Sequence, residues 1–156
     1  MKYVSILAAL LVFSLALPLA AQQEKPADNM SIVREAMRAD KKVVVADNMQ
    51  LTEPEAKAFW PVYEEYQTEM TAVGDRMIKL IEDYAASYEA MTDETAGKLL
   101  KEMMSVQGER LKVQEKYLPK FQKVLPMTKV ARFYQIENKL RAIVDYDLAA
   151  QIPLVQ

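Results

Sequence analysis

The chain contains neither cysteine nor histidine, and only three of its 156 residues are glycine. These absences exclude disulfide frameworks, thiol nucleophiles, histidine-based catalytic triads and almost every type of zinc site. The formal net charge of −2 argues against a nucleic-acid-binding surface, which usually needs a basic excess. Glycine-rich nucleotide loops and the common hydrolase motifs are also missing. We therefore predict a protein that is not an enzyme, needs no cofactor or metal and binds no nucleic acid.

The first 21 residues have the pattern of a secretory signal peptide: a basic start, an apolar run over residues 4–17 and small residues at the end. That run is shorter than the ~20 apolar residues that span a membrane, so we expect no transmembrane anchor. We predict cleavage after Ala21, a flexible lead-in over residues 22–30 and a single helical domain over residues 31–156. The expected location is the bacterial periplasm.

Helical periodicity dominates the rest of the chain, and no strand pattern of period two occurs. One short helix is expected over residues 31–47, and three longer ones over residues 53–89, 92–124 and 128–150. Short connections favour antiparallel neighbours, so the predicted fold is an all-α antiparallel hairpin or bundle. Pro61 and Pro119 lie inside two of the helices and predict kinks.

A seven-residue apolar repeat marks the face of each long helix that should pack in the core. The positions are Phe59, Tyr63, Tyr66, Met70, Val73, Met77, Leu80 and Tyr84, then Leu99, Met103, Val106, Val113, Tyr117 and Phe121, then Phe133, Ile136 and Leu140. Lys41 fills a gap in the apolar face of the first helix. Glu137 and Arg141 have the spacing of an ion pair on the far side of the last helix. The apolar residues 152–155 either pack back onto the bundle or are offered to a partner.

The segment from Leu51 to Glu55 predicts a helix start, with Thr52 as N-cap, Glu55 completing a capping box and Pro54 in the first turn. It is similar to the Leu-Thr-x-x-Gln motif of the Spy/CpxP family of periplasmic proteins, and Glu55 stands where that motif has Gln. The resemblance implies an elongated helical hairpin that pairs as a cradle-shaped homodimer. It also implies an ATP-independent chaperone or an envelope-stress accessory factor.

One departure from the family concerns charge, because the concave face of its best-known member is basic and this chain is mildly acidic. Seven basic residues nevertheless cluster in the last 41 residues, which predicts a local basic surface. They are Lys116, Lys120, Lys123, Lys129, Arg132, Lys139 and Arg141. Such a surface would speed encounter with acidic clients.

The methionines leave three interpretations open: core packing, an adaptable binding surface and a soft metal site for Cu(I). Met70, Met77 and Met103 fall on core positions of the repeat, which favours packing. The neighbouring carboxylates, such as Glu64 and Glu65, lie on charged helical faces with no nucleophile nearby, which favours a solvated surface over acid–base chemistry.

The pattern as a whole predicts a protein that binds partially unfolded envelope proteins without ATP, through an apolar stripe that thin helical packing does not wholly bury. A dedicated module for one protein partner and a metal-responsive binding protein are the alternatives. The residues expected to contact a client or partner are Phe59, Trp60, Tyr63, Arg110, Phe121, Arg132 and Phe133.

Overall fold

A computed structural model describes residues 40–155, which form helices joined by short turns and contain no strand. A helical segment over residues 40–49 precedes three long helices: α2 (Glu53–Ser87), α3 (Asp93–Gln122) and α4 (Met127–Gln151). A short 3₁₀ helix, η1 (Tyr88–Ala90), follows α2 directly. The all-α prediction is confirmed for this part of the chain. The predicted signal peptide, the lead-in and residues 31–39 of the first helix lie outside the described residues.

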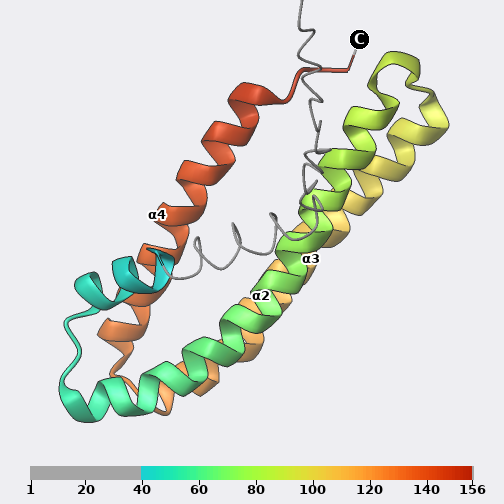
Figure 1. The fold of residues 1–156 in the computed structure, drawn as a ribbon. Coiled ribbons are helices and arrows are strands. Elements are labelled where there is room, and N and C mark those ends of the chain that lie inside the picture. Colours follow the sequence, from blue (N-terminus) through green and yellow to red (C-terminus); the bar gives the residue numbers. More distant parts are fainter. Residues whose placement is uncertain (1–39, 156) are drawn as a thin grey trace, which may run out of the picture. The chain divides into compact units, whose positions relative to one another are not determined.

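Helices α2 and α3 form a long antiparallel hairpin that closes at η1 (Figure 1). We call the end at η1 the tip and the opposite end the base. At the tip, the hydroxyl of Thr92 accepts a hydrogen bond from the backbone N–H of Thr95, as an N-cap should. Helix α4 turns back at the base and diverges from the hairpin toward its C-terminal end (Figure 1).

Pro61 and Pro119 lie within continuous helices rather than ending them. Each proline lacks an N–H, so the carbonyls of Lys57 and Glu115 lose their helical donors. Lys57 and Glu115 are both exposed, and water can supply the missing hydrogen bonds. Neither proline ends its helix, so the predicted kinks would lie within continuous helices.

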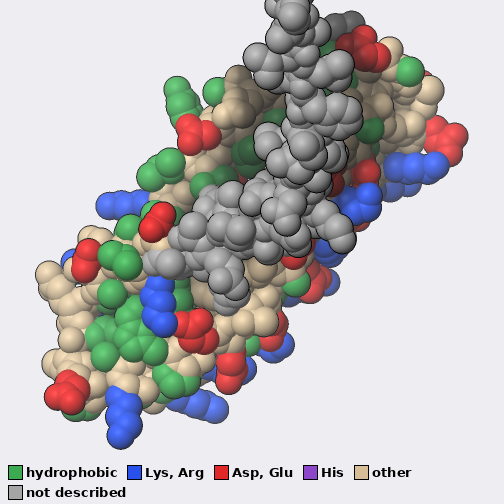
Figure 2. Space-filling view, viewed as in Figure 1, with side chains coloured by type: hydrophobic (Ala, Val, Ile, Leu, Met, Phe, Trp, Pro, Cys, Tyr) green, Lys and Arg blue, Asp and Glu red, His purple; other side chains and the backbone are tan. Residues whose placement is uncertain are grey.

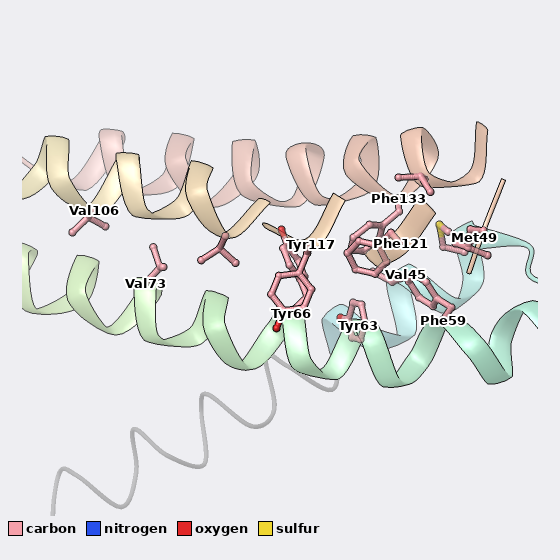
Figure 3. Close-up of a cluster of buried hydrophobic side chains, with 13 residues drawn as sticks. Val45, Met49, Phe59, Tyr63, Tyr66, Val73, Val106, Tyr117, Phe121 and Phe133 are labelled. Atoms are coloured by element: carbon pink, nitrogen blue, oxygen red, sulfur yellow. The ribbon is translucent and has the colours of Figure 1, made fainter. Parts of the chain in front are cut away.

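The core is concentrated at the base, where aromatic rings from the long helices meet (Figure 3). The ring of Phe121 lies 5.6 Å from that of Phe59 and 4.7 Å from that of Phe133. Tyr66 and Tyr117 face each other across the hairpin at 5.5 Å. The helical segment 40–49 closes this cluster by adding buried residues of its own. The base is therefore a closed core built from four chain segments.

Toward the tip, more positions of the same repeat are partly exposed, although Leu80 is still buried at 8% exposure. Val73 and Val106 still pack within the core, at 2% and 0% exposure. Nearer the tip on α3, Met103 is 37% exposed, although the repeat places it on the core face. A helix that packs against one neighbour buries only one stripe of its surface. The line of contact between α2 and α3, which we call the seam, is therefore partly open where α4, the third layer, has diverged from the hairpin.

A buried polar network joins the helical segment 40–49 and α4 to α2. The carboxylate of Glu137, only 5% exposed, accepts hydrogen bonds from Lys41 Nζ at 2.9 Å and Gln67 Nε2 at 3.3 Å. The hydroxyl of Tyr66 also donates to it, at 3.4 Å. Burial, with the Glu137 charge adding to it, raises the pKa of Tyr66 well above its usual value.

The predicted surface ion pair between Glu137 and Arg141 is therefore wrong. Glu137 lies inside and pairs with Lys41, whereas Arg141 pairs with Asp145 at 3.4 Å. Both i,i+4 partners were available to Arg141, and burial of Glu137 decides between them. Among the helices of residues 40–155, none is long and apolar enough to cross a membrane.

Candidate binding groove

The motif at the start of α2 connects the first turn of α2 to the first turn of α4. The backbone N–H of Thr52 donates to Glu55 Oε2 at 2.8 Å, and the Thr52 hydroxyl donates to the same oxygen at 3.0 Å. Glu55 also forms an ion pair with Lys129, in the first turn of α4. The hydrogen bond from Lys129, with that from Thr52, lowers the pKa of Glu55 to about 2. Leu51 packs against the core beside them, so the motif residues hold the base together.

Four of the seven residues predicted to contact a client lie in the core instead. Phe59, Phe121 and Phe133 are completely buried, and Tyr63 is 2% exposed. A side chain without exposed surface cannot meet a partner while the fold is intact. Their assignment to a client surface is therefore corrected: they stabilise the base.

The other three predicted residues lie on or near the surface but do not form one site. Trp60 is half-buried, with the Lys42 ammonium 5.2 Å above its ring. Arg132 is exposed and donates to the backbone carbonyl of Asn48, which ties α4 to the segment before α2. Arg110 is half-buried in the middle of α3.

The predicted basic surface is largely neutralised by acidic partners. Lys116 and Lys120 reach across the hairpin to Glu69 and Glu65, at 2.7 and 2.9 Å. Lys129 and Arg141 are also paired, as described above. The pairing with Lys116, and a hydrogen bond from the Tyr117 hydroxyl, lower the pKa of Glu69. Four of the seven basic residues are thus paired with carboxylates, whereas Lys123, Arg132 and Lys139 are exposed and remain the basic part of this surface.

The structure instead forms an open apolar groove toward the tip, and none of the seven predicted residues lines it. Its volume is about 510 Å³, within the range of sites that bind ligands. We call it the distal groove. It is lined by Met77, Leu80, Ile81 and Tyr84 of α2, by Met91, by Ala96, Leu99, Leu100, Met103 and Gln107 of α3, and by the C-terminal tail Ile152–Val155.

The lining of the distal groove is almost entirely aliphatic, aromatic or thioether. Leu100 is 50% exposed, and Val155 is 54% exposed. Hydrophobic side chains are also exposed over α4 (Figure 2). Ile143 and Tyr146 of that helix are 61% and 76% exposed. A groove of this kind offers contact area to apolar groups and no acid–base pair or nucleophile for chemistry. Within residues 40–155, no cluster of three or more carboxylates is placed to hold a metal ion.

The sequence contained the groove residues but did not separate them from the core. Met77, Leu80, Tyr84, Leu99 and Met103 all belong to the predicted seam. The groove residues differ from the core residues in their position near the turn after α2. Only a third helix that stays parallel to the hairpin could cover them there, and α4 diverges. The apolar tail was recognised, and it does pack back, although Leu154 is 88% exposed.

Comparison with known proteins gives no relative from which a function can be transferred. No family model, no curated protein and no solved structure matches this chain.

Proposed function

We propose that this protein is an exported, ATP-independent chaperone of the periplasm that holds apolar segments of partly unfolded envelope proteins. The distal groove carries this proposal, because it is open, about 510 Å³ in volume and lined by apolar side chains. An open apolar groove of this volume is a usual form of site for apolar groups. The lining methionines suit varied clients, since an unbranched thioether side chain adapts to irregular shapes.

The energetics of such a groove fit transient holding. Burying three aliphatic side chains of a client contributes about 5–9 kcal/mol in gross terms. Association costs about 4–15 kcal/mol in lost freedom, so the net affinity is weak and exchange is fast. A client that folds buries its own apolar segments and leaves the groove, which needs no nucleotide. The absence of a nucleotide-binding motif from the sequence agrees with this cycle.

The test follows light scattering of two unrelated aggregating clients, one acidic and one basic, with purified exported protein and no nucleotide. We expect suppression of both clients near stoichiometric ratio. Leu100→Asp places a charge in the groove and should abolish suppression. Leu111→Asp is the matched control, because Leu111 is a 55% exposed leucine of the same helix that does not line the groove.

Two other outcomes would contradict the proposal, one for client binding and one for the binding site. If the wild-type protein suppresses neither client, general client binding is wrong and a module for one dedicated partner takes its place. If Leu100→Asp suppresses aggregation as well as Leu111→Asp does, clients bind somewhere other than the distal groove. Circular dichroism of both variants checks that the charge has not unfolded the hairpin.

A further inference from the structure

The C-terminal tail lies against the distal groove as a bound segment would. Helix α4 ends at Gln151, and Ile152 has extended backbone angles of −86° and 115°. The next residue is Pro153, which favours an extended conformation at Ile152 and has no N–H that needs an acceptor. The tail Ile152–Val155 therefore leaves the helix and forms part of the wall of the groove.

A specific hydrogen bond fixes the tail to the hairpin. The hydroxyl of Tyr84, on α2, donates to the backbone carbonyl of Pro153 at 2.7 Å. A backbone carbonyl occurs at every residue of every protein, so this contact does not depend on a particular side chain. The aliphatic lining around it selects the side chains by their apolar character.

The tail is held only at its beginning. Ile152 is half-buried, whereas Leu154 and Val155 are 88% and 54% exposed. The groove keeps a volume of about 510 Å³ with the tail in place. A segment with so little burial exchanges readily with a competitor that fills the space better.

We propose that the tail Ile152–Val155 is an internal competitor for the distal groove, and that the groove takes extended aliphatic peptide segments whose backbone carbonyl is bound by Tyr84. The inference rests on the proposed function for the identity of the competitor, namely an unfolded client segment. Displacement of the tail then precedes client binding. The apparent dissociation constant for a client equals the intrinsic one divided by the fraction of molecules in which the tail is displaced.

The experiment measures binding of a fluorescent peptide with the tail sequence, Gln-Ile-Pro-Leu-Val-Gln, to the full exported protein and to a variant truncated after Gln151. We expect saturable binding to the truncated protein, at least about 5-fold tighter than to the full chain. In the truncated protein, Tyr84→Phe should weaken binding about 2- to 12-fold, the effect of one neutral hydrogen bond. A peptide in which Asp replaces both Ile and Leu is the control and should not bind.

Full-chain Ile152→Asp, which expels the tail without shortening the protein, provides a second route if truncation destabilises α4. No binding to either variant, or equal affinity for the wild-type and both variants, would overturn the proposal. Client suppression by the same proteins separates the two hypotheses. Suppression without peptide binding refutes the tail as competitor and leaves the chaperone. Peptide binding without suppression keeps the competing tail and refutes the general chaperone.

Discussion

Removing Lys41 should destabilise the protein far more than removing its neighbour Lys42, although both lysines form ion pairs. Lys41 pairs with Glu137, whose side chain is 4% exposed, whereas Lys42 pairs with Glu64 in a contact where both side chains are 48% exposed. Breaking a buried pair leaves an uncompensated charge and costs about 3–5 kcal/mol. Breaking an exposed pair costs at most about 1 kcal/mol.

The structure places the loss for Lys41→Met near the lower end of that range. In this variant Glu137 keeps hydrogen bonds from Gln67 and Tyr66, so its carboxylate is not left without donors. We therefore expect a loss of about 3 kcal/mol in the free energy of unfolding. The double variant Lys41→Met/Glu137→Leu removes both charges and should recover most of the loss, since an apolar replacement of a buried pair is often neutral.

Urea unfolding followed by circular dichroism measures all of these variants, with Lys42→Met as the matched control. The free energies are comparable if the dependence on urea concentration stays the same among variants. If Lys41→Met and Lys42→Met lose equal stability, the Lys41–Glu137 pair is not buried in solution. The single variant Glu137→Leu completes the set; if the double variant loses as much as Lys41→Met and Glu137→Leu together, the two charges do not interact.

Two further predictions concern the base. Phe133→Ala should cost about 3–5 kcal/mol in urea unfolding because it empties a completely buried ring site, whereas Tyr146→Ala, at 76% exposure, should change stability by less than about 0.5 kcal/mol. Glu55 contributes stability that is complete above its unfolded pKa of about 4.5 and is lost as the pH falls toward its folded pKa of about 2. Glu55→Gln should remove that part of the pH dependence of thermal unfolding between pH 4.5 and 2, and an unchanged profile would show that the pair with Lys129 does not form in solution.

Much of the fold could be predicted because its signals are local. The capping residues placed the start of α2 at Glu53. The seven-residue repeat identified the buried stripe of the hairpin, including Phe59, Tyr66 and Val73. Helix caps and the spacing of apolar residues act within one or two turns, so a single sequence contains the information that determines them.

The binding surface could not be predicted in the same way, because burial depends on segments that are distant in sequence. Glu137 and Lys41 are separated by 96 residues, and no local spacing reveals that they meet. Phe121 and Phe133 fall on core positions of the repeat and were also expected to contact a client, because the repeat alone does not distinguish a covered apolar stripe from an open one. The packing of α4 against the hairpin, which is what buries them, is not encoded in any local pattern.

The same repeat therefore has two roles along one hairpin, and the third layer decides which. At the base, α4 and the helical segment 40–49 cover the seam, and aromatic residues such as Phe59 lie in a closed core. At the tip, α4 has diverged, and seam residues such as Leu99 and Met103 line a groove. A chain with continuous periodicity thus builds a closed core at one end and an open groove at the other from one pattern. The client binding that we propose at the tip would involve few of the residues that stabilise the base, since the buried residues of the two ends are largely different.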